Sequence, residues 1–105
     1  MRTTNATPGI NPAQVRLTRV IEALAGHEIE GLRLADIAVA IGGTQPLTLR
    51  DLRSLAAAGW AEQRDDTRWR LGPKPVQIAI AFTTSTRRAQ ERIDEISQRY
   101  TRTPA

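Results

Sequence analysis

The stretch that decides the fold is Leu34-Ala35-Asp36-Ile37-Ala38-Val39-Ala40-Ile41-Gly42-Gly43-Thr44-Gln45-Pro46-Leu47-Thr48-Leu49-Arg50-Asp51-Leu52. Apolar residues recur at helical spacing in its first half, at Leu34, Ile37, Ala38 and Ile41. The pair Gly42-Gly43 supplies the backbone freedom for a sharp turn. Pro46 suits the first position of a second helix, with Thr44 or Gln45 as its cap. The pattern predicts a helix, a tight turn and a second helix.

The second helix of this motif is expected over residues 46–58, with Gly59 as its stop signal. Its buried stripe is predicted to be Leu49, Leu52, Leu55 and Ala56. The opposite face is then expected to carry Leu47, Arg50, Asp51 and Ser54, with Arg53 at its edge. Such a face can read bases when its helix enters a DNA major groove.

A short basic hairpin is expected next. Residues 60–63 and 68–71 are candidate strands, and the turn-rich link 64–67 has the length of a hairpin loop. Alternation places Trp69 and Leu71 on one face, with Arg68 and Arg70 on the other. Either indole could stack on a nucleotide, but an aromatic residue in a two-stranded sheet usually packs on the helices beneath, so we assign both tryptophans to the core.

Before the motif, residues 1–10 are polar and interrupted by Pro8 and Gly9, which predicts a flexible N-terminal arm. Asn11-Pro12 is a start signal for a helix that reaches about Ala25. Its core-facing stripe is Leu17, Val20, Ile21 and Leu24. His27 lies in an acidic turn and is expected to be solvated and without a role. Residues 11–73 should form one domain.

After the hairpin, Pro73 and Pro75 are expected to separate it from a last helix over about residues 76–100, within a segment 74–100 assigned to dimerisation. A 3-4-3-4 apolar spacing, typical of a coiled-coil seam, runs through Ala79, Phe82, Thr86, Ala89, Ile93, Ile96 and Tyr100. A partner helix is favoured over folding back on the chain's own domain. The run 82–86 has poor helix propensity and suggests a bend. Residues 101–105 are expected to be a flexible tail.

Two pairs on that helix, Arg87 with Glu91 and Glu95 with Arg99, lie one turn apart and are expected to form exposed ion pairs.

The composition limits the class of protein. The chain has 105 residues and 40% hydrophobic residues, which suffices for one small domain with a thin core. It has no cysteine and a single histidine, so we expect no metal site and no cofactor. Positive residues outnumber negative ones by 15 to 11, and all but Lys74 are arginine, which suits phosphate and guanine. A net charge of +4 is modest, and an arginine bias can also reflect a GC-rich genome.

The sequence offers little for catalysis or for membranes. Ser54, Ser85 and Ser97 lack the flanking glycines of a nucleophile elbow, and the only histidine lies far from them in sequence. The adjacent carboxylates Asp65-Asp66 and Asp94-Glu95 point apart on a strand or helix. We therefore expect no enzyme. No apolar run is long enough to span a bilayer and no signal peptide is evident, so we expect a cytoplasmic protein.

Several motifs occur in the order found in one bacterial family. They are Leu34-Ala35-Asp36-Ile37-Ala38, the stretch 55–59, Glu62, and Arg68-Trp69-Arg70-Leu71-Gly72-Pro73-Lys74. The chain resembles the N-terminal DNA-binding domain of IclR-type transcription regulators, without gaps from about Val15 to Ala79. The resemblance implies a winged helix-turn-helix whose second motif helix reads DNA, whose hairpin is the wing, and whose following helix helps to pair subunits.

The chain departs from the family pattern in two ways. It lacks the ligand-sensing domain that usually follows, so no small-molecule effector is expected. The recognition helix of the family commonly opens with a proline, a basic residue and a Ser-Thr pair, whereas Thr44-Gln45-Pro46-Leu47 stands here. The base preferences of the family therefore do not transfer. A stand-alone domain of this size resembles regulators encoded by phages and mobile elements.

The expected fold class is mainly α with a small β-hairpin, a winged helix-turn-helix followed by a long C-terminal helix. The expected function is sequence-specific binding of double-stranded DNA by a homodimeric transcription regulator. The DNA-binding candidates are Thr44, Gln45, Leu47, Arg50, Asp51, Arg53, Ser54, Arg64, Arg68 and Arg70, with Arg2 of the arm as a further candidate. The dimerisation candidates are Phe82, Ala89, Ile93, Ile96 and Tyr100.

The alternative is a winged-helix protein-interaction module, such as an antirepressor or assembly factor, that does not bind DNA. Asp51 and Asp65-Asp66 favour it, because carboxylates repel phosphate. Arg50, Arg53 and the hairpin arginines oppose it.

Overall fold

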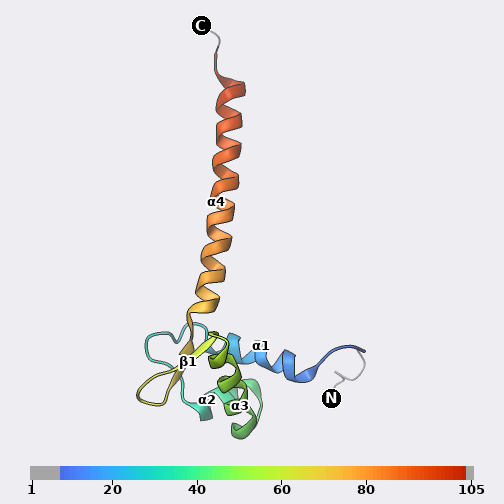
Figure 1. Ribbon diagram of the computed structural model, residues 1–105, viewed down its shortest axis with the longest axis vertical. Coiled ribbons are helices and arrows are strands. Elements are labelled where there is room, and N and C mark those ends of the chain that lie inside the picture. The colour runs from blue at the N-terminus through green and yellow to red at the C-terminus, as the bar shows by residue number, and fades with distance from the viewer. Residues whose placement is uncertain (1–7, 104–105) are drawn as a thin grey trace. The chain divides into compact units, whose positions relative to one another are not determined.

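The computed structural model describes residues 8–103, in the order three helices, a hairpin and a long helix (Figure 1). The expected fold class is confirmed. The chain divides into two compact units, Met1–Lys74 and Pro75–Ala105. Arg2 and most of the expected arm, residues 1–7, lie outside the described residues, as do residues 104–105 of the expected tail. None of the helices among the described residues has the length and apolar character needed to cross a membrane.

Helix α1 spans Pro12–Leu24 and begins as the sequence predicts. The Asn11 side chain accepts a hydrogen bond from the Ala13 backbone N–H at 2.9 Å, and Pro12 follows the cap without losing a bond. Val20 and Leu24 are fully buried, and Leu17 and Ile21 pack against the core at the edges of the same stripe. The helix therefore buries the face that its periodicity indicates.

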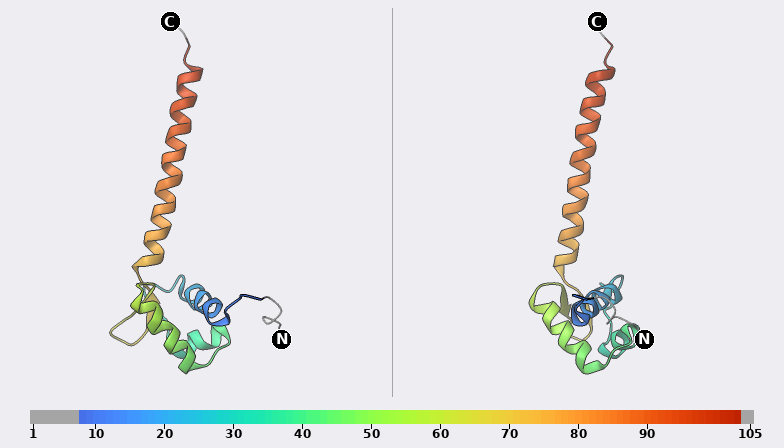
Figure 2. Two further views of the ribbon diagram at one scale, coloured as in Figure 1. Left: turned by 45° about the vertical axis from the view of Figure 1, so that its right-hand side comes forward. Right: turned by 90° about the vertical axis from the view of Figure 1, so that its right-hand side faces the viewer.

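Helices α2 (Leu34–Ile41) and α3 (Gln45–Ala57) form the helix-turn-helix. Gly42 adopts a left-handed conformation with φ of 68°, which a residue with a side chain rarely accepts, so the glycine makes the turn possible. Thr44 caps α3 and Pro46 lies in its first turn. Figure 2 shows α1, α2 and α3 grouped together in both views.

The buried face of α3 differs from the predicted stripe. Its buried residues are Thr48, Asp51, Leu52 and Leu55, which follow a 3-1-3 spacing along one side of the helix. Leu49 and Ala56 are only half-buried at the edge of the core. The predicted stripe was therefore rotated, because apolar residues were chosen over the small polar Thr48 and the charged Asp51.

The hairpin consists of β1 (Ala61–Gln63) and β2 (Trp69–Leu71), paired antiparallel with Ala61 opposite Leu71 and Gln63 opposite Trp69. The expected burial of Trp69 is confirmed at 4% exposure, and Trp60 packs half-buried against the core. Trp69 also exchanges two backbone hydrogen bonds of 2.8 Å with Leu32, an isolated bridge on the other edge of β2. This third chain segment ties the wing to the loop before α2.

Helix α4 spans Pro73–Thr101, so the expected start at residue 76 was three residues late. Pro73 and Pro75 lie inside its first turn instead of preceding it. Proline is accepted there because the first N–H groups of a helix have no acceptor within the helix. α4 also continues through residues 82–86, where a bend was expected (Figure 2). The Thr83 hydroxyl donates to the Ala79 carbonyl at 3.0 Å.

Candidate nucleic-acid interface

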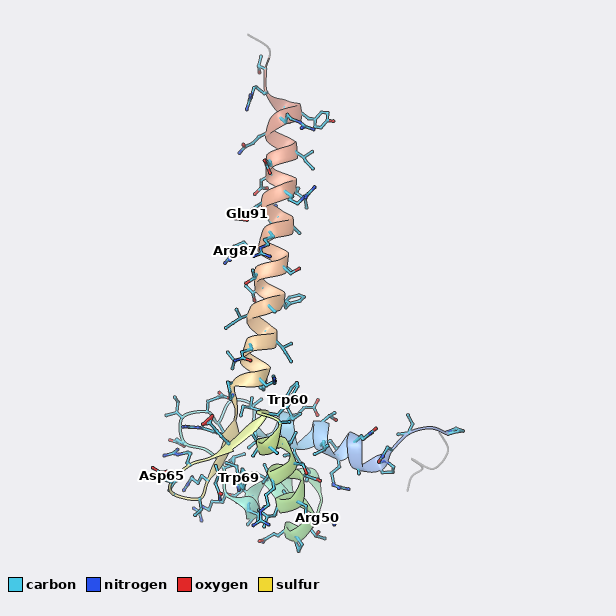
Figure 3. The ribbon with its side chains drawn as sticks, in the orientation of Figure 1. Arg50, Trp60, Asp65, Trp69, Arg87 and Glu91 are labelled. Atoms are coloured by element: carbon cyan, nitrogen blue, oxygen red, sulfur yellow. The ribbon has the colours of Figure 1, made fainter. Side chains whose placement is uncertain are left out.

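The exposed face of α3 carries two arginines without partners. Arg50, Arg53 and Ser54 are exposed, and Leu47 is 38% exposed one turn earlier. Among residues 8–103, neither arginine makes a side-chain hydrogen bond or an ion pair. Figure 3 shows Arg50 on α3, projecting away from the hairpin. Both guanidinium groups therefore remain available for an anionic or hydrogen-bonding partner.

The start of α3 is built by Thr44. Its hydroxyl accepts a hydrogen bond from the Leu47 N–H at 3.4 Å, and its carbonyl accepts from the Thr48 N–H at 3.0 Å and from the Thr48 hydroxyl at 2.7 Å. Pro46 contributes no N–H to this end of the helix. The Gln45 side chain is exposed. Thr44 therefore shapes the start of α3. Of these two DNA-binding candidates, Gln45 is the one whose side chain makes no hydrogen bond among the described residues.

Asp51 was expected on the outer face of α3, and this was wrong. Asp51 is only 6% exposed, and both of its carboxylate oxygens accept hydrogen bonds from Arg16 on α1. Arg16 Nε lies 2.6 Å from Oδ2 and Nη2 lies 3.1 Å from Oδ1. This hydrogen bonding raises the pKa of the Arg16 guanidinium above its usual value, against the opposing effect of burial. Asp51 therefore lies on the buried side of α3 against α1, and not on the exposed face that carries Arg50 and Ser54.

The wing arginines differ from those of α3 in having acidic neighbours. Arg64 donates from Nη1 to the Ile29 carbonyl at 2.6 Å and places Nη2 3.4 Å from Asp66. Arg68 Nε lies 3.9 Å from the same carboxylate, which also accepts a hydrogen bond from the Arg68 N–H at 3.2 Å. Arg64 thus connects the wing to the loop before α2, while Asp66 stabilises the turn. Asp65 is exposed in this loop (Figure 3).

The other strand face carries a cross-strand pair. Arg70 Nη2 lies 3.2 Å from Glu62 Oε2, and the two residues are opposite each other in the β1–β2 register. Both side chains are more than a third exposed, so the attraction is screened by water and worth at most about 1 kcal/mol. The pair can open when a phosphate competes for the guanidinium.

Arg33 is a candidate that the sequence reasoning missed. It is exposed and precedes α2 directly, at the cap position, where its side chain makes no capping hydrogen bond. In helix-turn-helix proteins the first helix of the motif crosses the DNA backbone. The sequence feature that could have identified Arg33 is its position directly before the Leu34 motif. The sequence analysis overlooked it because the residue belongs to a loop.

The candidate dimerisation residues form an apolar row along α4. Phe82, Ile93, Ile96 and Tyr100 are between 48 and 77% exposed, and Ala89 is exposed between them. All of α4 belongs to the described residues, and none of its residues is buried. The expected pairs Arg87–Glu91 and Glu95–Arg99 are absent from the ion pairs of residues 8–103, although Arg87 and Glu91 share one side of the helix (Figure 3).

Comparison with solved structures finds two similar proteins. HmgR from Pseudomonas aeruginosa is 27% identical with a TM-score of 0.63, covering 72% of this chain and 32% of HmgR. An IclR homolog from Microbacterium sp. strain HM58-2 is 20% identical with a TM-score of 0.62, covering 85% of this chain and 38% of the homolog. No family model matches the sequence, and no similar curated protein was found.

These neighbours confirm the resemblance to IclR-type regulators. The fold is that of a DNA-binding transcription regulator, a winged helix-turn-helix with a following helix. The chain spans 32% and 38% of the two neighbours. No cluster of three or more His, Cys, Asp or Glu residues that could hold a metal ion occurs in the described part of the chain.

Proposed function

We propose that this protein is a transcription regulator that binds double-stranded DNA sequence-specifically through α3. The observation that carries the proposal is the pair of exposed guanidinium groups, Arg50 and Arg53, left without acidic partners on the outer face of α3. An arginine fork matches the two acceptors that guanine presents in the major groove. A helix held by two packed neighbours is the element that other winged-helix proteins place there.

Within this proposal the residues of α3 have separate roles. Arg50 and Ser54 read base edges, and Leu47 offers an apolar contact to a thymine methyl group. Arg53 at the edge of the face contacts phosphate. Gln45 holds the backbone near the helix start, while Thr44 keeps that start in shape by capping it. Asp51 is removed from the DNA-contacting set, because its oxygens are occupied by Arg16.

The wing and the start of α2 supply contacts that carry no sequence information. Arg68 and Arg70 lie on the hairpin and contact phosphate or the minor groove, exchanging Asp66 and Glu62 for stronger anionic partners. Arg33 contacts the DNA backbone from the start of α2. Arg64 holds the wing against the Ile29 loop, and its contribution to DNA binding is indirect.

The proposal includes a homodimer formed through α4 by Phe82, Ala89, Ile93, Ile96 and Tyr100. Their exposed row offers apolar surface that water does not stabilise, and a second copy of the helix presents the same row in return. The two α3 helices would then enter successive major grooves about 34 Å apart. On this proposal, DNA binding takes place in the cytoplasm.

The interaction-module alternative has lost part of its support. Asp51 was one of its acidic features, and this carboxylate is buried against Arg16. Asp66 is engaged with the backbone and side chain of Arg68 and with Arg64. Asp65 alone of the three remains exposed without a partner among the described residues. One free carboxylate at the tip of a loop is a weak obstacle to DNA binding.

The test is selection of bound duplexes from a random pool at near-physiological salt. The proposal expects an enriched motif with two-fold symmetric half-sites, because each protomer of a dimer reads one half. The same protein is then titrated with the selected duplex and with a scrambled one over a range of salt concentrations. A pool that stays random, together with no binding at low salt, would refute DNA binding and favour the interaction module.

A further inference from the structure

One ion pair connects two helices of the winged domain. Arg16 on α1 and Asp51 on α3 are 35 positions apart in sequence and are joined by two hydrogen bonds, of 2.6 Å and 3.1 Å. The other ion pairs of residues 8–103 all join residues between Glu62 and Arg70 inside the hairpin. The Arg16–Asp51 pair is therefore the single charged link between α3 and the rest of the helical frame in the described chain.

The geometry of this link is directional. A guanidinium edge and a carboxylate that share two parallel hydrogen bonds lie in one plane, so they fix the rotation of one side chain against the other as well as its distance. The other buried residues of α3 are Thr48, Leu52 and Leu55. Thr48 bonds within its own helix, and apolar packing by the two leucines is non-directional. We call the Arg16–Asp51 pair the fork. Of the buried contacts of α3, the fork alone fixes the rotation of α3 about its axis against α1 by hydrogen bonds.

The position of Asp51 makes that rotation matter for recognition. Arg50 precedes it directly and Ser54 follows three residues later, on the exposed side. Successive residues of a helix are 100° apart, so a fixed direction for Asp51 fixes the directions of both neighbours. Burial also argues against a role in stability alone. A buried ion pair costs desolvation, and apolar replacements of similar volume often stabilise a protein as well or better.

We infer that Arg16 and Asp51 are positioning residues that set the rotation of α3, and through it the sequence selectivity of DNA binding. The inference rests on the proposed function for its consequence in recognition. It assigns Arg16, on a helix outside the helix-turn-helix, a part in specificity without any contact to a base.

The first test is the double variant Arg16→Met/Asp51→Leu, which removes the fork but leaves the net charge unchanged. Dissociation constants are measured for the selected duplex and for a scrambled duplex. Affinity for scrambled DNA, which depends on net charge, should stay unchanged, while the preference for the selected duplex should fall about tenfold, as expected for misplaced base contacts. Arg16→Lys keeps the charge but loses the planar fork, and should lose part of the preference.

Val20→Ala is the matched control, because Val20 is fully buried on the same helix and touches neither partner of the fork through a hydrogen bond. It should lower the melting temperature and leave the preference intact. If the folded double variant and Arg16→Lys both discriminate between duplexes as well as the wild type, the inference is overturned.

A second measurement does not depend on DNA. Residual dipolar couplings of backbone amides report the orientation of α3 against α1 in the free protein, and both fork variants should change them while Val20→Ala should not. Unchanged couplings overturn the positioning role whatever the DNA result. If the fork variants alter the couplings but the wild-type protein binds no duplex, the positioning role is supported and the proposed function is refuted.

Discussion

At the scale of single residues, the arginines of the winged domain divide by their partners. Arg50 and Arg53 form no ion pair among the described residues, whereas Arg16 and Arg70 each lie within 3.2 Å of a carboxylate. A guanidinium that already has a good partner gains less from a phosphate or a base, because it must first give that partner up. The unpaired arginines should therefore contribute most to recognition.

Arg50→Ala and Arg68→Ala should have different effects on binding. Loss of Arg50 should cost about 1–3 kcal/mol on the selected duplex and relax the base preference at one position, because a base contact is lost. Loss of Arg68 should weaken all duplexes similarly and reduce the salt slope by about one, because a phosphate contact is lost. Fluorescence anisotropy titrations at several salt concentrations measure both. Arg87→Ala on α4 is the control for removing one positive charge. Equal losses on selected and random duplexes for both variants would contradict the division.

Gly31 and Gly26 offer a matched pair for testing how tightly the wing packs. Both have positive φ, so alanine at either should cost about 1–2 kcal/mol of backbone strain. A Cβ on Gly31 would lie 2.9 Å from Arg68 Cβ and 3.1 Å from the Trp69 carbonyl, whereas one on Gly26 meets nothing within 4 Å. Gly31→Ala should therefore lose about 1–3 kcal/mol more than Gly26→Ala, as overpacking usually does. Urea unfolding followed by circular dichroism gives the difference, and equal losses would show that the wing yields easily.

The sequence predicted the buried residues of α1 well but placed Asp51 on the wrong side of α3. Periodicity identified Val20 and Leu24 because apolar residues alone carry that signal. A carboxylate is assigned to solvent by default, since burying it without a partner is costly. Its partner, Arg16, comes from another helix 35 positions earlier. Such a pairing is a tertiary contact that no local pattern encodes.

At the scale of elements, capping and turn residues predicted helix ends correctly. The errors of the sequence prediction occurred at prolines and at a single paired residue outside the strands. Asn11 and Gly42 mark helix ends where predicted. Pro73 and Pro75 were taken as breakers, although the first turn of α4 accepts them. The Leu32–Trp69 bridge was missed because a single paired residue shows no alternation. Sequence alone therefore gave the hairpin but not its attachment to the domain.

That attachment can be tested at Arg64. Arg64→Ala removes the hydrogen bond to the Ile29 carbonyl and one partner of Asp66, which should loosen the loop against the wing by about 1 kcal/mol. Amide hydrogen exchange at Leu32, whose N–H donates to Trp69, should become about fivefold faster, because local opening then costs less. Arg19→Ala, an exposed arginine on α1, is the control. Exchange at Leu32 that equals the wild-type rate would mean that the backbone bridge suffices without Arg64.

At the scale of the whole molecule, function depends on what covers the apolar row of α4. The sequence predicted the row itself, because heptad spacing is visible in one chain. It could not decide between a partner helix and the chain's own domain, since both would bury the same side chains.

Ile93→Asp or Ile96→Asp should convert the proposed dimer into a monomer. Each places a carboxylate in the centre of the row, where desolvation against a partner costs several kcal/mol, roughly the cost of burying an unpaired charged group. Gln98→Asp introduces the same charge on the side away from the row and should leave the dimer intact. Sedimentation equilibrium gives the mass.

A monomer should also bind a single half-site with about half the salt slope of the dimer, because it neutralises half as many phosphates. An unchanged mass for both isoleucine variants would assign the row to another contact, and a wild type that is itself monomeric would remove the paired-groove arrangement from the proposal.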